Sequence, residues 1–257
     1  DDLNHSLAEF RNIGLSVAND EQVAFADVFT PMLVGGFEGK KRFGDDYMIA
    51  GKDGVHPGWA GHLVMAYAFL KAMGLDGQIG TITVNLADGK ATASEGHRVL
   101  TAEPGRIEIE SNRYPFCAAG PIDNDGSIRS GMELVPFNAE LNRFLLVIPN
   151  APAGNYRVTW GETSKTYTAA DLAKGVNLAA DFEVNPFSEA FKAVDEAVAR
   201  KQAYETRQIK DLFHGPEGQA DITMTASLTE KVRAPLAAAV SKAFVPIRHT
   251  ITIRSEP

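Results

Sequence analysis

Apolar residues recur at helical spacing near the start of the chain and predict a helix over residues 3–18. The apolar positions of this helix are Leu3, Leu7, Phe10, Ile13 and Val17. The stretch "VAFADVF", residues 23–29, alternates apolar and polar positions and predicts a strand with Asp27 inside it. The chain is therefore expected to begin with a helix that leads into a strand.

A glycine-rich stretch follows at residues 30–52, where five glycines and Pro31 predict a long loop. The apolar run from Trp59 to Met73 then predicts a helix, and Gly74 stands in the usual position beyond a helix C-terminus. A helix, a strand, a loop and a helix in this order favour part of an α/β layered structure.

After Gly77 the pattern changes to short alternating segments joined by turns rich in Asp-Gly, Pro-Gly and Ala-Gly. These segments, which predict an antiparallel β region, are "GTITVNLADGKATAS", "HRVLTAEPGRIEIES" and "RFLLVIPNAPAGNYRVTW". Helical periodicity returns over residues 186–213 and 228–244, and "VPIRHTITI" at 245–253 predicts a final strand.

Composition and charge narrow the classes of partner. The 257 residues carry a formal net charge of -8, and the lysines and arginines are scattered, which argues against nucleic acid or an anionic membrane as a partner. No run of eighteen apolar residues is present, so no membrane span is predicted. The single cysteine, Cys117, excludes an internal disulfide and a multi-thiolate metal site. A neutral or weakly polar small molecule is the expected ligand.

The stretch "DGVHPGWAGH", residues 53–62, offers the most specific chemistry in the chain. A histidine that acts as a general base toward a hydroxyl needs one ring nitrogen facing that hydroxyl and the other held by an acceptor, usually a carboxylate. Asp53 and His56 lie three residues apart, so both side chains can point the same way from one turn. The structural alternative is an aspartate that caps the following helix, with a histidine packed beside it.

This stretch and its surroundings closely resemble the C-terminal end of the SGNH hydrolases, also called GDSL-type esterases and lipases. The matching segments are "VAFADVFTPML", the glycine-rich loop, "DGVHPGWAGH" and "LVMAYAFLKAMGLDG". In that family a D-x-x-H motif completes a Ser-His-Asp catalytic triad. The resemblance therefore implies that His56 is the general base and Asp53 its orienting carboxylate.

The resemblance also implies the fold class and the domains. The class is α/β: the C-terminal portion of a flavodoxin-like, three-layer α/β/α SGNH sheet, followed by an antiparallel β domain and C-terminal helices. Residues 1–77 would be the C-terminal part of the SGNH domain. Residues 78–184 would form a β-rich, sandwich-like accessory domain, and residues 185–257 a helical segment with a final strand. The extension is similar to that of a bacterial subgroup of the family.

The motifs that supply the nucleophile in the family are not found in this sequence. A G-D-S motif and a G-x-N-D motif would precede D-x-x-H, whereas the near matches here are "FGDDYM" and "SVAND". We therefore expect the serine to lie on a separate or missing N-terminal part of the same protein.

The predicted function is that of a serine esterase that hydrolyses carboxylic esters and uses no metal or organic cofactor. Acetylated saccharides are one candidate substrate because of the appended β domain, and a polysaccharide substrate would favour a secreted or periplasmic location. The alternative, from another class, is a non-catalytic glycan-binding or structural β module attached to an inactive hydrolase remnant.

Two further residues are candidates for substrate binding. Trp59 would line the substrate mouth beside His56, and its alternative role is a packing anchor at the helix start. Arg113, within "ESNRYPFCAAG", would bind a carboxylate or a sugar, and its alternative role is at a strand end that helps to fill the β core. His62 lies six residues after His56, a spacing that does not suit a two-histidine zinc site on one helix face.

Overall fold

The structure is a computed structural model that describes residues 2–256. The chain divides into two compact units, each assembled from three stretches of sequence. The first unit contains the residues up to Thr81, together with Ala118–Leu146 and Val176–Glu183. The second contains Ile82–Cys117, Val147–Gly175 and the residues from Val184 onward. Stretches of the predicted ranges 78–184 and 185–257 therefore fold together in the second unit.

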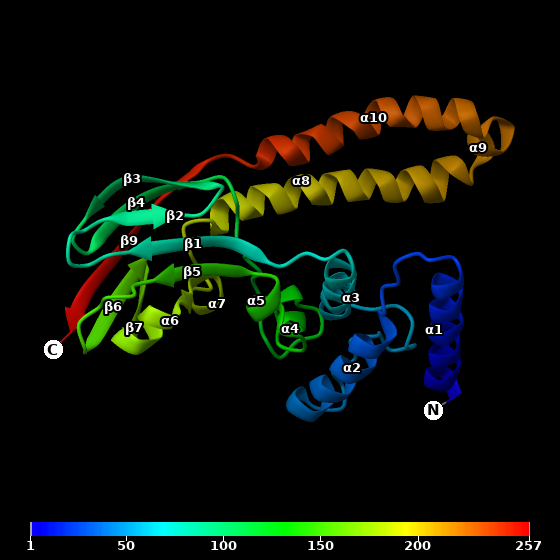
Figure 1. Cartoon of the computed structure of the whole chain (residues 1–257). Coiled ribbons are helices and arrows are strands. Elements are labelled where there is room, and N and C mark those ends of the chain that lie inside the picture. The colour runs from blue at the N-terminus through cyan, green and yellow to red at the C-terminus, as the bar shows by residue number, and fades with distance from the viewer. Residues whose placement is uncertain (1, 257) are drawn as a thin grey trace. The chain divides into compact units, whose positions relative to one another are not determined.

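The first unit is mainly helical (Figure 1). Its longer helices are α1 (Asp2–Asp20), α2 (Phe29–Phe43) and α3 (Trp59–Ala72), and its short helices are α4 (Ile128–Met132), α5 (Phe137–Glu140) and α7 (Leu178–Asp181). Helices α1 and α3 confirm the two helices expected from the apolar spacing. Gly74 has a φ of 77° just beyond α3, the left-handed conformation that commonly ends a helix.

The strand expected over residues 23–29 is wrong, and so is most of the loop expected over residues 30–52. Asp27 accepts hydrogen bonds from the backbone N–H of Thr30 at 3.0 Å and from the Thr30 hydroxyl at 2.7 Å, at the start of α2. The same carboxylate pairs with Arg11 of α1 at 2.8 Å. An acidic residue that binds the first free N–H groups of a helix is a strong start signal, and here it outweighs the short alternating pattern.

The chain is a mixed α/β protein, as predicted, but the three-layer part expected in residues 1–77 is not seen. Residues 2–77 form three helices and no strand, and the first strand of the described chain begins at Gln78. The reason is local: the residues expected to form the sheet strand lie in the connection to α2 and in its first turn.

The glycines expected in a loop instead allow α2 to pack closely. Gly35 and Gly39 lie four residues apart on α2, and both are buried. A Cβ atom on Gly39 would lie 2.5 Å from Cδ1 of Tyr47, and one on Gly35 would lie 3.3 Å from Cδ1 of Ile49. Since Tyr47 and Ile49 belong to the buried core that includes α3, these glycines bring α2 against that core.

Two sheets carry the strands. The four-stranded sheet has the order β2-β1-β5-β8, made by β1 (Gln78–Val84), β2 (Ala91–Ala93), β5 (Arg143–Val147) and β8 (Val176–Asn177). The five-stranded sheet has the order β3-β4-β9-β6-β7, made by β3 (His97–Glu103), β4 (Arg106–Ser111), β6 (Asn155–Trp160), β7 (Thr163–Thr168) and β9 (Ile247–Glu256). Every neighbouring pair in the five-stranded sheet is antiparallel, which confirms the predicted antiparallel β region in part, because the four-stranded sheet is mixed.

The last strand holds the second unit together. Strand β9 lies at the centre of its sheet, where Ile251 pairs with Ile107 of β4 and with Trp160 of β6. These three side chains are fully buried. The expected final strand is thus confirmed, and it is part of the β core rather than an appendage to the C-terminal helices.

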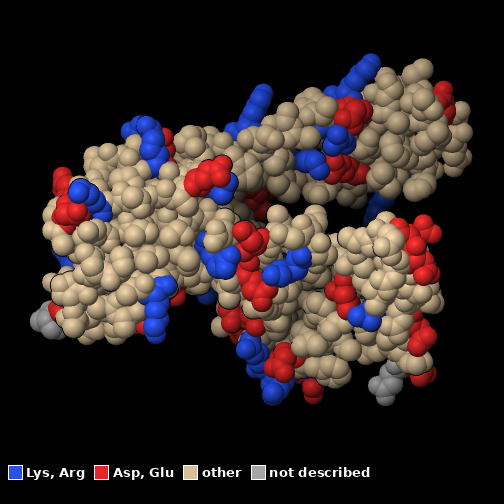
Figure 2. Space-filling view, in the orientation of Figure 1, with Lys and Arg blue, Asp and Glu red and all other residues tan. Residues whose placement is uncertain are grey.

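The remaining helices lie between strands β7 and β9 along the chain. They are α6 (Ala169–Lys174), α8 (Ser188–Arg207), a π-helical turn η1 (Gln208–Phe213), α9 (Pro216–Ala220) and α10 (Ile222–Ala243). Helices α8 and α10 run side by side (Figure 1), and Tyr204 and Gln208 hydrogen-bond to Thr229 between them. Among the described residues, no helix combines the length and the hydrophobicity needed to cross a bilayer. Acidic and basic side chains are interspersed on the face shown in Figure 2.

A chain of hydrogen bonds crosses the core of the second unit. Trp160 Nε1 donates to His249 Nδ1 at 3.1 Å, so a neutral His249 carries its proton on Nε2 and donates it to Ser111 Oγ at 2.9 Å. Ser111 Oγ also lies 2.8 Å from His97 Nδ1. Burial lowers the pKa of His249 to about 3. Both histidines are therefore part of the core.

The packing of α2 predicts opposite effects for two neighbouring glycine substitutions. Gly39→Ala should lower the free energy of unfolding by about 1–3 kcal/mol, because the new methyl group collides with the Tyr47 ring. Gly36→Ala should raise it by about 0.5–1 kcal/mol, because its Cβ has room and alanine favours the helix. Urea unfolding followed by circular dichroism measures both. Equal effects of the two substitutions would contradict this account of α2.

Candidate active site

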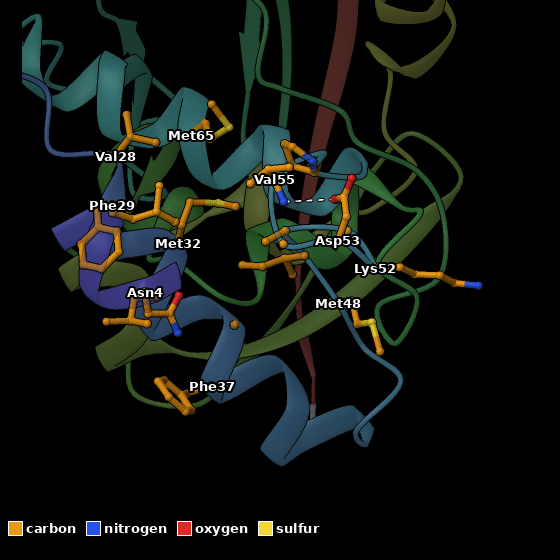
Figure 3. Close-up of a pocket in the computed structure, with 18 of the residues that line it drawn as sticks. Asn4, Val28, Phe29, Met32, Phe37, Met48, Lys52, Asp53, Val55 and Met65 are labelled. Atoms are coloured by element: carbon orange, nitrogen blue, oxygen red, sulfur yellow. Dashed lines mark hydrogen bonds between the residues drawn. The ribbon is translucent and has the colours of Figure 1, made fainter. Parts of the chain in front are cut away.

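Asp53 and His56 form a hydrogen-bonded pair on the connection between α2 and α3. His56 Nδ1 lies 2.6 Å from Asp53 Oδ2. The other carboxylate oxygen, Oδ1, accepts the backbone N–H groups of Val55 and His56, each at 3.1 Å. Figure 3 shows Asp53 with the bond from Val55 as a dashed line. One carboxylate therefore orients the imidazole ring and also fixes the turn that carries it.

The geometry assigns the two ring nitrogens different roles. Beside a carboxylate, Nδ1 of a neutral imidazole is the donor, so Nε2 carries the lone pair and can accept a proton. In the part of the chain that the structure describes, Nε2 of His56 makes no hydrogen bond, and the His56 side chain is 85% exposed. A hydroxyl brought to this side chain would meet an available base.

Hydrogen bonds stabilise the negative charge on the Asp53 carboxylate. Its hydrogen bond from the His56 side chain, followed by the two backbone N–H groups, lowers the pKa of the carboxyl to about 2. Asp53 is therefore ionised at any pH at which His56 could act as a base, and it can stabilise an imidazolium beside it.

Glycines make the tight connection possible. Gly51 has a φ of 78°, and a Cβ atom there would lie 2.1 Å from the carbonyl oxygen of His56. The backbone of Gly51 thus passes directly beside the backbone of His56, in a conformation that residues with side chains rarely adopt. This close approach folds the connection back on itself and keeps the pair on one turn.

A cavity of about 780 Å³ lies beside Asp53, within the first unit, and its described lining includes Asp53 but not His56. Asp53, Val55 and Pro57 line it, together with residues of α1, α2 and α3 (Figure 3). Most of the lining is apolar and includes Leu7, Val28, Phe29, Met32, Leu33 and Met65. Small-molecule sites typically combine an apolar cavity of this size with a few polar groups.

The other residues expected at the site lie in different settings. Trp59 begins α3, is 61% exposed and faces the ring of His62 at 6.2 Å between centroids. Arg113 belongs to the second unit, where its guanidinium pairs with Glu95 at 3.4 Å. His62 Nδ1 bonds to the carbonyl oxygen of Gly58 at 2.9 Å, a contact within the first turn of α3. The structure thus brings Asp53 and His56 together, and substrate binding by Trp59 and Arg113 stays a prediction.

Three side chains with a hydroxyl or thiol group, Cys117, Ser127 and Ser130, are buried or partly buried. Burial raises the pKa of Cys117 to about 11, so the thiolate is disfavoured. Ser130 is fully buried and donates its hydroxyl to the carbonyl oxygen of Ile122 at 2.6 Å. Ser127 is also buried. Across residues 2–256 we find no group of three or more His, Cys, Asp or Glu side chains placed to hold a metal ion.

Comparisons with known proteins give one informative similarity. No family model and no curated protein sequence matches the chain. A solved structure of a gut microbial diltiazem-metabolizing enzyme superposes on 98% of this chain with a TM-score of 0.69 and 20% sequence identity. The chain spans 66% of the length of that enzyme's chain. The two proteins therefore share a fold over almost all of the present sequence.

The hydrogen bonds of Asp53 predict how its carboxyl group titrates. A ¹³C NMR titration of the Asp53 side chain should give a pKa of about 2 in the native chain. In His56→Ala the largest of the causes that lower this pKa is lost while the backbone N–H groups remain, so the value should rise part of the way toward 3.8. Because the folded-state pKa is depressed, the contribution of this carboxylate to stability is present above pH 3.8 and is lost as the pH falls toward 2. An unchanged pKa in His56→Ala would show that the side-chain bond does not form.

Proposed function

We propose that this chain is part of an SGNH-type serine esterase that hydrolyses carboxylic esters. In this proposal His56 is the general base, Asp53 is its orienting carboxylate, and a part of the protein outside these 257 residues supplies the serine. The observation that carries the proposal is the 2.6 Å hydrogen bond that holds His56 by Nδ1 and leaves Nε2 facing outward.

The pair would act twice in each turnover. First, Nε2 of His56 takes the proton of the serine hydroxyl as its oxygen attacks the ester carbonyl carbon, and Asp53 stabilises the imidazolium. When the tetrahedral intermediate collapses, the C–O bond to the alcohol breaks and His56 returns the proton to the leaving alkoxide oxygen. His56 then activates a water molecule in the same way, and the acyl group leaves as a carboxylic acid while the serine is regenerated.

The similar solved structure is that of an enzyme. It is described as a gut microbial diltiazem-metabolizing enzyme. The shared fold supports an enzymatic role for the present chain, and the reaction is assigned from the site. The assignment to ester hydrolysis therefore rests on the pair, and the similarity adds support to it.

The lining of the cavity favours an apolar group in the substrate. Burial of apolar surface is favourable by roughly 25 cal/mol per Å², whereas a sugar would leave its hydroxyl groups without partners against Leu33, Met32 and Met65. We propose that the cavity holds the acyl chain or an apolar alcohol of the ester. Acetylated saccharides would then bind with the sugar outside this cavity.

The central test uses the complete, serine-bearing protein and p-nitrophenyl acetate. His56→Ala should lower kcat by about 10³-fold or more, because the three residues of a catalytic triad act as a unit and the loss of one disables the other two. The matched control is His214→Ala, which removes an exposed histidine of the second unit and should leave kcat within about twofold.

Two results would contradict the proposal. Full activity in His56→Ala would show that His56 is not the general base. Glycan binding without any hydrolysis would favour the non-catalytic module. The 257-residue chain alone should show only background turnover. If this chain alone shows turnover that depends on His56, His56 would still be the general base, but the serine could not lie outside the 257 residues.

If the cavity holds the acyl chain, narrowing it should slow the hydrolysis of long-chain esters more than that of short-chain esters. Gly36 lines the cavity, and its Cβ position has no neighbour closer than 3.9 Å, so Gly36→Leu can extend into the space without a backbone clash. This variant should lower kcat/KM for p-nitrophenyl hexanoate about tenfold and for the acetate less than threefold. Gly36→Ala serves as the control for the helix itself. A parallel loss for both esters would argue against acyl binding in this cavity.

A further inference from the structure

One residue binds both ends of the loop that carries Asp53 and His56. The Asp125 carboxylate oxygen Oδ2 accepts the backbone N–H of Met48 at 2.8 Å, before the pair. The backbone carbonyl oxygen of Asp125 accepts the N–H of Ala60 at 3.1 Å, after the pair. Since Ala60 lies in the first turn of α3, this second bond satisfies an N–H group that has no partner within the helix.

The two ends of the loop are also packed directly against their neighbours. A Cβ atom on Gly58 would lie 3.1 Å from the carbonyl oxygen of Asp125. A Cβ atom on Gly61 would lie 2.1 Å from the carbonyl oxygen of Ile49. Backbone therefore meets backbone at the exit of the loop: a side chain would be tight at Gly58 and would clash at Gly61.

Asp125 itself is held by the segment around it. Ser130 donates its hydroxyl to the carbonyl oxygen of Ile122, so the Tyr47 hydroxyl is the donor in its short hydrogen bond to Ser130 Oγ. The Asn124 side chain accepts the N–H of Gly126 at 2.8 Å. These contacts tie residues 122–130 to Tyr47, which immediately precedes Met48, and they hold the segment that carries Asp125 in place.

A short series of backbone hydrogen bonds leads from Asp125 to the pair. Met48, whose N–H is bound by Asp125, accepts the N–H of Gly51 at 2.9 Å through its own carbonyl oxygen. The Gly51 carbonyl oxygen accepts the N–H of Gly54 at 3.2 Å. Gly54 follows Asp53 directly, so a shift of Met48 is transmitted to the carboxylate that holds His56.

We propose that Asp125 is a positioning residue for the Asp53–His56 pair, acting by clamping the two ends of their loop with its carboxylate and its backbone carbonyl group. This inference rests on the proposed function, because positioning matters for catalysis only if the pair is catalytic. It adds a residue that lies 77 positions from Met48 in the sequence and, among the described residues, makes no hydrogen bond or ion pair with either member of the pair.

The test compares three variants by amide hydrogen exchange and by the ¹³C titration of the Asp53 carboxyl group. Asp125→Ala removes the carboxylate contact and should speed exchange at the Met48 amide at least tenfold, while the Asp53 pKa rises from its value of about 2. Asp125→Asn keeps an amide oxygen that can accept the same N–H, so both readouts should return close to those of the native chain. Asp123→Ala, an exposed aspartate of the same loop, should change neither.

In the serine-bearing protein, Asp125→Ala should lower kcat about tenfold with little change in KM, and Asp125→Asn should restore it to within about twofold. If Asp125→Ala does not fold, Asp125→Glu replaces it, because the extra methylene displaces the carboxylate and should still speed exchange at Met48.

The outcomes separate the two proposals. Native exchange at Met48 and a native Asp53 pKa in a folded Asp125→Ala or Asp125→Glu variant would overturn the clamp and leave the esterase proposal standing. Altered exchange and pKa, with full activity in His56→Ala, would support the clamp and overturn the esterase.

Discussion

The hydrogen bond from His56 Nδ1 to the Asp53 carboxylate is the interaction on which the functional account depends. Both side chains are largely exposed, at 85% and 53%, and exposed ion pairs contribute little to folding stability. The bond between the two side chains therefore contributes little to holding the loop. The Asp53 carboxylate fixes the turn itself through the backbone N–H groups of Val55 and His56, and the two ends of the loop are fixed by contacts with residues outside it.

Those contacts come from a distant stretch of sequence. Residues 118–146 return to the first unit after the chain has entered the second, and they place Asp125 and Ser130 against the loop. The site therefore depends on a stretch that is distant in sequence but belongs to the same unit, and not only on the D-x-x-H motif. The rigid support behind an exposed pair is what a preorganised base requires, because each functional group must be held in its productive geometry before the substrate arrives.

The sequence predicts the parts of this protein that depend on local patterns. Helices α1 and α3, the antiparallel strands and the final strand follow from periodicity, and Asp53 with His56 follows from spacing on one turn. Helix α2 was missed because Gly35 and Gly39 indicate a loop in sequence, although in the structure they permit close packing. Asp125 could not be predicted, because its contact with Met48 joins residues 77 positions apart and leaves no local signal.

The most direct test of the central claim is the protonation of the two His56 nitrogens, measured by ¹⁵N NMR at about pH 9, where a free imidazole is neutral. The account predicts that Nδ1 carries the proton and shows coupling across the hydrogen bond to Asp53, while Nε2 has the chemical shift of an unprotonated nitrogen. A proton on Nε2, or rapid averaging of both forms in the native chain, would contradict the account, because His56 would then present no fixed base to a hydroxyl.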